Sequence, residues 1–320
     1  MEIMVELNGL SKHFGSVVAV NDISFNVAKG EVLGFLGPNG AGKTTTMRMV
    51  AGYLSPSSGK VSICGYDVEN FPIKAKQMLG YLAEGSPSYD DMTVREFLTF
   101  IASIRGLSGD FLLKRIDQII AQTSLEDVIE RKIEFLSKGY KRRVGLAQSI
   151  IHDPPVLILD EPTDGLDPNQ KHEVRKLIKE MSSDKAIIIS THILEEVQAV
   201  CSRAIIIGNG TLLADGTADN LLSQLPDYLA VNIIVEKNTK DKFISHLNNL
   251  DLIDSLNEDA MSDDQVKLIC MSKQNKIIIP EIISSLAKSD LYPVEIFQNR
   301  GDLDTVFREI TLGGRDQKNA

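Results

Sequence analysis

One short segment restricts the fold of this chain more than any other. The segment GPNGAGKT, residues 37–44, has two glycines five positions apart, followed by lysine and threonine. An apolar run, EVLGFL, precedes it, and residues 43–52 are expected to form a helix. A glycine-rich turn between a strand and a helix allows successive backbone N–H groups to point at phosphate oxygens. The segment therefore predicts a P-loop, and with it an α/β fold.

The residues of this predicted P-loop have distinct expected tasks. Lys43 would neutralise the β- and γ-phosphate oxygens of a nucleotide, and the Thr44 hydroxyl would be a ligand of Mg²⁺. The positive end of the following helix would add its dipole. Nucleotide contacts are expected from Gly37, Pro38, Asn39, Gly40, Ala41, Gly42, Lys43, Thr44 and Thr45. The motif alone does not separate a kinase from a GTPase, a helicase or a transport motor.

Two acidic residues end a second apolar run. The segment VLILDE, residues 156–161, has the pattern of a strand buried on both faces of a parallel sheet. Asp160, at the end of this strand, is placed to hold Mg²⁺ directly or through water. Glu161 points elsewhere and can act on an attacking water as a general base or orient it. After a P-loop, such a strand is a strong indication of a nucleotide site.

The hydrophobic pattern divides the chain into two predicted domains, residues 1–222 and 223–320. In the first domain, strands are expected within residues 2–36 and a helical subdomain at about 88–150. In the second, the expected elements follow the order β-α-β-β-α-β, which is the split-βαβ, ferredoxin-like pattern. We find no catalytic cluster in the second domain and predict a small accessory α+β domain.

Two helical stretches of the first domain carry specific predictions. Thr93 and Glu96 have the spacing of a capping box. One face of the helix that follows is expected to carry Phe97, Phe100, Ile101 and Ile104. A basic run, residues 141–143, lies on a later helix whose other side is apolar. We interpret this run as a solvated helix face rather than a nucleic-acid patch.

Charge and hydropathy argue against several classes of function. The net charge is −10, so an exposed nucleic-acid surface is not expected, and no nucleic-acid partner is predicted. Residues 1–15 lack a basic segment followed by an apolar one, so we expect no signal peptide. No apolar run approaches the roughly 18–20 residues that cross a bilayer, so the chain is not expected to span a membrane by itself.

Further motifs resemble those of one family. Between the P-loop and VLILDE lies FLSKGYKRRVGLAQSII, residues 135–151. A segment of the LSGGQ type, a helix and then a second carboxylate strand form the signature of ABC ATPases. The chain resembles this family over about residues 3–220. The resemblance implies an antiparallel N-terminal β-subdomain, a mostly parallel core sheet, a helical subdomain, and hydrolysis of ATP with Mg²⁺ as cofactor.

The resemblance also implies roles for residues outside the P-loop. Phe14 in KHFG would stack on adenine, and Glu84 in GYLAE would contact the nucleotide, Mg²⁺ and a membrane partner. Asp167 in DGLDP would lie in the loop that crosses to a second subunit, and His192 in STH would be the switch histidine. The residues expected to carry the chemistry are Lys43, Glu161 and His192.

The signature segment implies a paired assembly. In such proteins it covers the γ-phosphate bound by a second subunit, so Ser137 and Gly139 would contact ATP in trans. We therefore predict a homodimer or a paired ATPase subunit. The segment reads LSKGY, with Lys138 and Tyr140 as departures from the family pattern, and Glu84 stands where many members have glutamine. Ser137 and Gly139 match the pattern, so activity is expected.

The type of ABC protein is a separate question. No long coiled coil separates residues 43 and 137, unlike repair proteins, and only one cassette is present, unlike most translation factors. The segments FLGPNGAGKTTTMRMVAG and LDTVFREIT resemble ABC-2 type exporters, including gliding-motility and multidrug-associated ATPases. We predict the ATPase subunit of a bacterial exporter, cytoplasmic and peripheral on the inner membrane face, which binds a separate transmembrane permease. Two alternatives stay open, a soluble switch acting on ribosomes or nucleic acid and a module that binds ATP without turnover.

Overall fold

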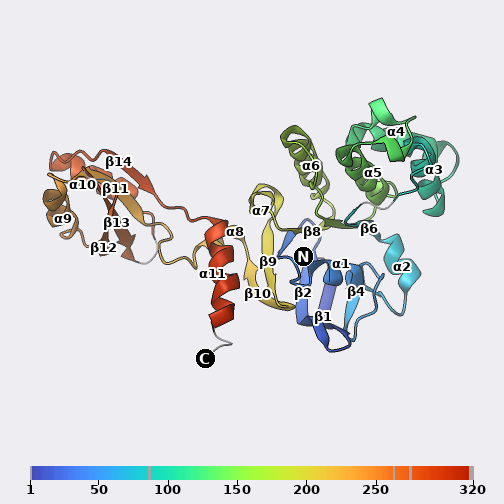
Figure 1. Cartoon of the computed structure of the whole chain (residues 1–320), viewed down its shortest axis with the longest axis horizontal. Helices are drawn as coiled ribbons and strands as arrows, with labels where there is room; N and C mark the ends of the chain where they lie inside the picture. The colour runs from blue at the N-terminus through green and yellow to red at the C-terminus, as the bar shows by residue number, and fades with distance from the viewer. Residues whose placement is uncertain (1, 86–87, 262–263, 274–275, 317–320) are drawn as a thin grey trace. The chain divides into compact units, whose positions relative to one another are not determined.

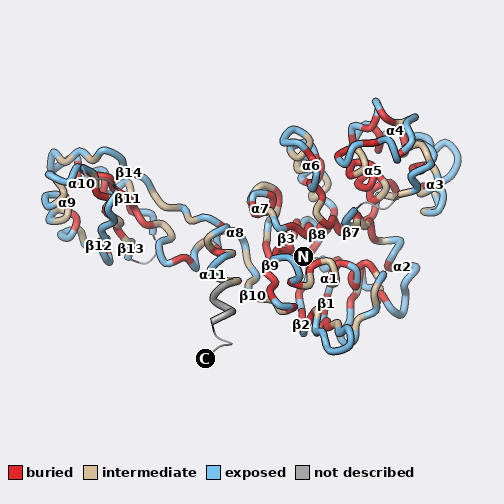
Figure 2. Tube along the Cα trace, viewed as in Figure 1, coloured by how far each residue is buried: buried red, intermediate tan, exposed pale blue. Residues whose placement is uncertain are grey.

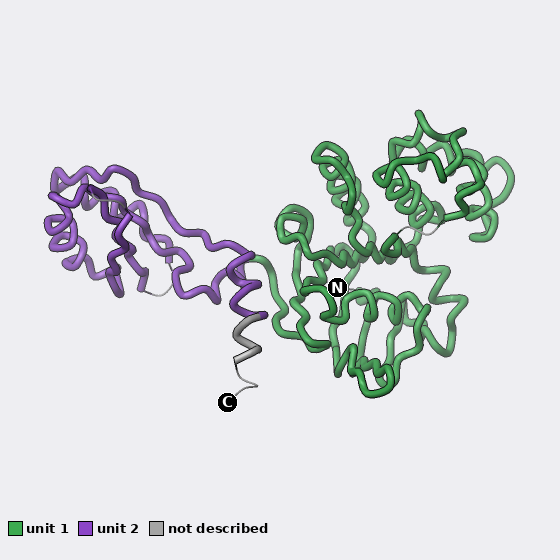
Figure 3. Tube along the Cα trace, viewed as in Figure 1, with its two compact units in different colours: residues 1–218 green, residues 219–320 purple. Residues whose placement is uncertain are grey.

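The computed structural model describes residues 2–85, 88–261, 264–273 and 276–316. The chain divides into two compact units, residues 1–218 and 219–320 (Figure 3). Each unit has a hydrophobic core of its own. Within the described ranges, every helix is too short or too polar to cross a membrane.

An antiparallel sheet of four strands opens the first unit, in the order β2-β1-β4-β5. Its strands are β1 (Ile3–Phe14), β2 (Val17–Ala28), β4 (Ser58–Ile63) and β5 (Tyr66–Asp67). Alternate residues of β2, namely Ile23, Phe25 and Val27, are buried, as the period of two predicts. This sheet is the expected antiparallel subdomain.

The core sheet of the first unit has six strands in the order β10-β9-β3-β8-β7-β6. They are β3 (Val32–Leu36), β6 (Leu79–Leu82), β7 (Val156–Asp160), β8 (Ala186–Thr191), β9 (Arg203–Gly208) and β10 (Thr211–Gly216). Strand β10 forms a hairpin with β9, and the other neighbours are parallel. Every residue of β3, β7 and β8 is buried, and Figure 2 shows this band of burial. The mostly parallel core sheet is thus confirmed.

The register of this sheet brings three chain segments together. Leu36 at the end of β3 lies opposite Thr191, and Asp160 at the end of β7 lies opposite Ser190. The loops after β3, β7 and β8 therefore leave the sheet at the same edge. Ligands of parallel α/β sheets bind at this carboxyl edge.

Helices cover the core sheet and form a separate helical subdomain. Those next to the sheet are α1 (Lys43–Val50), α2 (Pro72–Gln77), α6 (Pro168–Met181) and α7 (Leu194–Val200). The helical subdomain consists of α3 (Val94–Ile104), α4 (Gly109–Thr123) and α5 (Lys138–Ile150), which pack against one another (Figure 1). Short 3₁₀ turns lie at Glu126–Val128 and Ile133–Phe135. The predicted capping box is present, with Thr93 and Glu96 each accepting from the other's backbone N–H.

The predicted apolar face of α3 is only partly correct. Phe97 is buried, but Phe100 is 38% exposed and Ile104 is 65% exposed. The helix packs instead through a neighbouring stripe, which consists of Val94, Phe97, Leu98 and Ala102. The apolar residues of α3 cover more than one face, so the sequence does not indicate which face the rest of the unit covers.

The second unit confirms the predicted β-α-β-β-α-β order. Its elements are β11 (Val231–Glu236), α9 (Lys240–Leu247), β12 (Ile253–Ala260), β13 (Gln265–Ser272), α10 (Ile279–Lys288) and β14 (Glu295–Gln298). The strands pair antiparallel in the order β12-β13-β11-β14, as the split-βαβ pattern requires. Helix α8 (Ala218–Leu222) precedes this sheet, and α11 (Leu303–Asp316) follows it.

Candidate active site

A cavity of about 280 Å³ opens at the carboxyl edge of the core sheet. Four chain segments contribute to it: Ala19 on β2, the loop between β3 and α1 with the first turn of α1, the residue two positions after β6, and the end of β7. Its walls consist of Ala19, Pro38, Asn39, Gly40, Gly42, Lys43, Thr44, Thr45, Glu84, Asp160 and Glu161. The structure therefore brings together residues that the sequence analysis assigned separately to phosphate and metal binding.

The P-loop backbone approaches its neighbours too closely for larger residues. At Gly42, where φ is 103°, a Cβ atom would lie 2.5 Å from the Ala19 carbonyl oxygen. At Gly37, a Cβ atom would lie 2.6 Å from the Ile207 carbonyl oxygen. Helix α1 begins directly after Gly42; its first turn holds no acidic residue, and no side chain of the described residues caps it. Its first N–H groups and its dipole are therefore suited to an anion.

Lys43 is buried beneath this loop. Its Nζ donates to the carbonyl oxygens of Gly37 at 2.6 Å and of Pro38 at 3.3 Å. Burial lowers the pKa of Lys43, while the carboxylates of the cavity oppose this effect. The ammonium group is thus held among loop carbonyls at the base of the predicted phosphate site.

Asp160 is the most buried carboxylate of the cavity, at 1% exposure. Among the described residues, nothing hydrogen-bonds its Oδ2. Burial raises its pKa, and the nearby charges of Glu84 and Glu161 act in the same direction, while the Ser190 hydroxyl and the charge of Arg142 oppose them. A buried carboxylate oxygen without a partner fits a divalent cation, and Thr44 and Glu84 line the same cavity.

Protein groups alone do not complete a metal site there. Within the described residues, no three His, Cys, Asp or Glu side chains are grouped for metal binding. Mg²⁺ commonly uses one or two protein ligands together with substrate phosphate oxygens and water. The donor set of Asp160 and Thr44 therefore fits Mg²⁺ that arrives with a nucleotide.

The raised pKa of Asp160 makes a prediction about stability. The Asp160 carboxyl has a higher pKa in the folded chain than in the unfolded chain, so its protonated form favours folding. At neutral pH the group is ionised, and its burial then lowers the free energy of unfolding. Asp160→Asn should therefore raise the melting temperature of the nucleotide-free protein at pH 8 by a few degrees, and the gain should shrink as the pH falls through the folded pKa. Calorimetry at several pH values measures this. Asp164→Asn, at an exposed position, is the control. An unchanged or lower melting temperature for Asp160→Asn at pH 8 would contradict a raised pKa of Asp160.

Glu161 and His192 form the second part of the site. Glu161 has a φ of 52°, which is rare for a residue other than glycine and typical of strained functional positions. Its Oε1 lies 2.9 Å from His192 Nδ1, and its Oε2 accepts a hydrogen bond from Thr191 Oγ1 at 3.4 Å. Glu161 lines the same cavity as Asp160, and a carboxylate there could act on an attacking water.

Other predicted nucleotide contacts lie outside the lining of this cavity. Phe14, at the end of β1, is 50% exposed and has Lys12 Nζ at 5.3 Å from its ring centre. Val17 and Val18, which the sequence analysis did not single out, are exposed opposite Phe14 and His13 in the β1–β2 pairing. Together they form an apolar edge that suits stacking of a base.

The signature residues and Asp167 also lie outside this lining. Ser137 caps α5 by accepting from the Tyr140 N–H, and Asp167 caps α6 by accepting from the Gln170 N–H. Gly139 is buried, and a Cβ atom there would lie 2.7 Å from Gln170 Oε1. In the described structure, none of these residues lines the P-loop cavity of its own chain.

The prediction that the basic run is a solvated face is wrong for Arg142 and Arg143, which are 6% and 8% exposed. Arg142 donates to the Ala83 carbonyl oxygen at 2.9 Å and to the carbonyl oxygens of Asp160 and Glu161. It therefore joins α5 to the segment that carries Asp160 and Glu161. Its partners are backbone atoms far away in the sequence, so no sequence pattern indicates this role.

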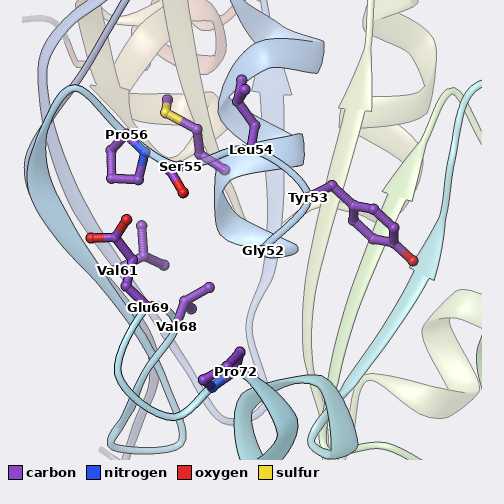
Figure 4. A pocket seen from close by; sticks show the side chains of 10 residues that line it. Gly52, Tyr53, Leu54, Ser55, Pro56, Val61, Val68, Glu69 and Pro72 are labelled. Carbon is purple, nitrogen blue, oxygen red and sulfur yellow. The ribbon is translucent and has the colours of Figure 1, made fainter.

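The first unit has further hollows besides this cavity, and two of them lie beside α1 and the loop after it. One, of about 300 Å³, lies near the end of α1 and is lined by both polar and apolar side chains, with Ser55, Val68 and Glu69 among them (Figure 4). No described lysine or arginine lines it, so it lacks a group that would attract phosphate. Tyr53 points away from the other side chains in Figure 4, and its ring lies 5.5 Å from that of Tyr81.

The other hollow is a cleft of about 640 Å³ between the core sheet and the helical subdomain. Apolar residues from α2, α3 and the loop after α1 line it, and Ile73, Tyr53 and Ile104 among them are strongly exposed. Lys76 and Arg105 also line it, and Arg105 donates to the Lys76 carbonyl oxygen. The cleft is the largest of these hollows and carries no phosphate-binding loop.

Comparison with known proteins was made for sequence and for structure. A family model described as "ABC transporter" matches residues 20–164. An uncharacterized ABC transporter ATP-binding protein of Bacillus subtilis, YdbJ, is 32% identical over 318 residues, 99% of this chain and 98% of YdbJ. This chain is an ABC transporter ATP-binding protein. Its ABC ATPase cassette therefore binds and hydrolyses ATP.

Two more ABC transporter ATP-binding proteins are similar to this ABC ATPase, one in sequence and one in structure. Nod factor export ATP-binding protein I of Burkholderia lata is 36% identical over 219 residues, 68% of this chain and 72% of that protein. A solved ATP binding subunit of an ABC transporter superposes with a TM-score of 0.65 at 31% identity, over 69% of this chain and 92% of the other. The ABC cassette fold predicted from the sequence is confirmed.

Proposed function

We propose that this ABC ATPase is the motor subunit of an ABC-2 type exporter and binds a separate membrane permease from the cytoplasmic side. The single observation that carries the proposal is the cleft with exposed Ile73, Tyr53 and Ile104. A cavity of this kind with exposed apolar walls is typical of a surface that binds a partner. The export function named for the Nod factor relative supports the direction of transport.

The site residues act on ATP in the following way. The P-loop N–H groups and Lys43 hold the phosphates, and Asp160 and Thr44 would hold Mg²⁺, which neutralises charge on the phosphate oxygens when bound. Glu161 orients and deprotonates the attacking water. His192, 2.9 Å from Glu161, keeps that carboxylate in place and can contact the γ-phosphate. Phe14 stacks on the adenine.

Two copies of the chain complete each site. Ser137 is exposed at the N-terminal end of α5, where its hydroxyl can donate and the helix dipole is positive. It does not line its own P-loop cavity, so its phosphate partner comes from a second copy. ATP between the two P-loops and the two signature helices would draw the copies together, and hydrolysis would release them.

The permease occupant of the cleft is an amphipathic cytoplasmic helix. Its apolar residues would cover Ile73 and Ile104, and an acidic residue would complement Lys76 and Arg105 at the cleft. Closing of the paired cassettes would then move this helix. The chemical energy of ATP reaches the membrane through that contact.

Ile73→Asp should reduce recovery of the permease at least about tenfold, because it places a charge in the apolar contact. The measurement is a pull-down of the tagged protein from detergent-solubilised native membranes, followed by mass spectrometry. Leu113→Asp is the matched control, since Leu113 is 61% exposed on α4 but does not line the cleft. Both variants should hydrolyse ATP in solution.

Two outcomes would overturn the exporter proposal. The first is equal recovery of a polytopic membrane protein by the Ile73→Asp and Leu113→Asp variants. The second is recovery of ribosomal or nucleic-acid proteins with no membrane protein, which would favour a soluble switch.

A further inference from the structure

Two helices next to the site, α6 and α7, pack together and carry buried polar atoms that have no hydrogen-bond partner in the described structure. Glu196 on α7 is 2% exposed, and in the described structure neither of its carboxylate oxygens has a hydrogen-bond partner. Arg175 on α6 has a buried Nε that also has no partner among the described residues. An unpaired buried carboxylate is costly, so its presence calls for a reason.

The two groups influence each other. Burial and the charge of Glu161 raise the pKa of the Glu196 carboxyl, while the nearby Thr191 hydroxyl and the charges of Arg175 and Lys171 on α6 lower it. The nearest ion pair of Arg175 is with Glu195, at 3.9 Å, and the Glu195 side chain is 83% exposed. Arg175 therefore makes a long ion pair with the exposed Glu195, and in the described structure it makes none with the buried Glu196.

A short series of hydrogen bonds connects Glu196 with the catalytic carboxylate. The Glu196 N–H donates to the Ile193 carbonyl oxygen at 3.2 Å, and the Ile193 N–H donates to Thr191 Oγ1 at 3.0 Å. Thr191 Oγ1 in turn donates to Glu161 Oε2. A shift of α7 therefore reaches both Glu161 and the adjacent His192.

Helix α6 connects the same region with the predicted subunit contact. It begins at its cap Asp167, in the loop 164–168 that is expected to meet the second copy. Arg175 lies two turns further along α6, facing α7. A movement of this loop therefore moves Arg175 relative to Glu196.

We propose that Glu196 is a positioning residue for ATP hydrolysis, which pairs with Arg175 when two copies close on ATP and so fixes Glu161 and His192 in their catalytic arrangement. This inference rests on the proposed two-copy site. The pair makes the catalytic arrangement depend on the presence of the second copy. ATP hydrolysis is then coupled to closure, because an isolated cassette leaves the pair open.

The test compares Glu196→Gln, Arg175→Gln and the double variant in ATP hydrolysis. Each single variant should lower kcat about tenfold with little change in KM, because the group acts through others and does not touch ATP. The double variant should be no slower than the slower single variant, since both remove the same pair. Glu195→Gln is the matched control and should stay within about twofold of the unaltered chain. Melting temperatures without nucleotide establish that every variant is folded.

These measurements test the Glu196–Arg175 pair and the two-copy site separately. Additive losses in the double variant, or an unchanged kcat in Glu196→Gln, would overturn the pair. The two-copy site is measured independently in the unaltered chain, as a rate per molecule that rises with protein concentration. A rate per molecule that is independent of concentration would overturn the two-copy site and, with it, the closure-dependent role of Glu196.

Discussion

The Glu161→Gln variant should bind ATP but release phosphate at least about a hundredfold more slowly than the unaltered chain. A general base contributes about two to four orders of magnitude, and the amide cannot accept the proton of the attacking water. Binding should persist because Lys43, Thr44 and the P-loop backbone are unchanged. The measurements are phosphate release at saturating ATP and binding of a fluorescent ATP analogue.

The control for this variant is Glu195→Gln, which changes an exposed carboxylate on α7 in the same way. It should retain the normal rate. If Glu161→Gln kept more than about a tenth of the activity, another group would have to act on the water, and the assignment of Glu161 would be wrong. An unaltered chain that binds ATP without any release of phosphate would favour a binding module instead.

Replacing Arg142 with methionine should lower both stability and activity. The guanidinium donates to the carbonyl oxygens of Ala83, Asp160 and Glu161. In the variant the Glu161 oxygen would keep the Asp164 N–H as a donor, while those of Ala83 and Asp160 would lose the donor that Arg142 supplies. Each such loss costs about 1–3 kcal/mol, so we expect the free energy of unfolding to fall by at least about 2 kcal/mol. Urea denaturation of the variant and the unaltered chain measures this loss.

Arg143→Met separates stability from catalysis. Arg143 is equally buried on the same helix, but it donates to the Ser124 carbonyl oxygen and to Glu173, away from the cavity. We expect both variants to be destabilised and only Arg142→Met to lose at least about tenfold in kcat at a temperature where both are folded. Equal kcat values in the two variants would show that Arg142 has a structural role alone.

Those parts of the site that depend on local sequence were predictable. The glycines before Lys43, the apolar strand before Asp160 and the strand before His192 each have a chemical reason that a short segment contains. The parallel order of β3, β7 and β8 then brings their ends together, and that order follows from continuous apolar runs alternating with helices. The C-terminal unit was predictable for the same reason, since its strands and helices alternate in a known pattern.

The missed features depend on contacts between distant residues. Arg142 lies in a run of basic residues, which in the sequence is typical of an exposed helix face. In the fold, carbonyl groups at the ends of β6 and β7 accept hydrogen bonds from its buried guanidinium. Glu196 lies next to Glu195 in the chain, and only the packing of α6 on α7 distinguishes the buried carboxylate from the exposed one. The covered face of α3 is likewise decided by α4 and α5 rather than by its own pattern.

The roles of Ser137, Gly139 and Asp167 depend on a second copy of the chain. Their positions in one copy are those of helix caps and a tight packing contact. These local roles explain why the residue types are suitable, but ATP bound across two copies is what would give them a catalytic role. The central claim of a shared site therefore concerns the assembly.

The most direct measurement is the molar mass of the Glu161→Gln variant by sedimentation equilibrium, with and without ATP and Mg²⁺. This variant should retain ATP, so the closed pair should accumulate. The account predicts a monomer of about 35 kDa without nucleotide and a dimer of twice that mass with ATP. The Ser137→Arg change in the same background should restore the monomer, because it obstructs the contact with the partner's γ-phosphate. A monomer in the presence of saturating ATP would contradict the shared site.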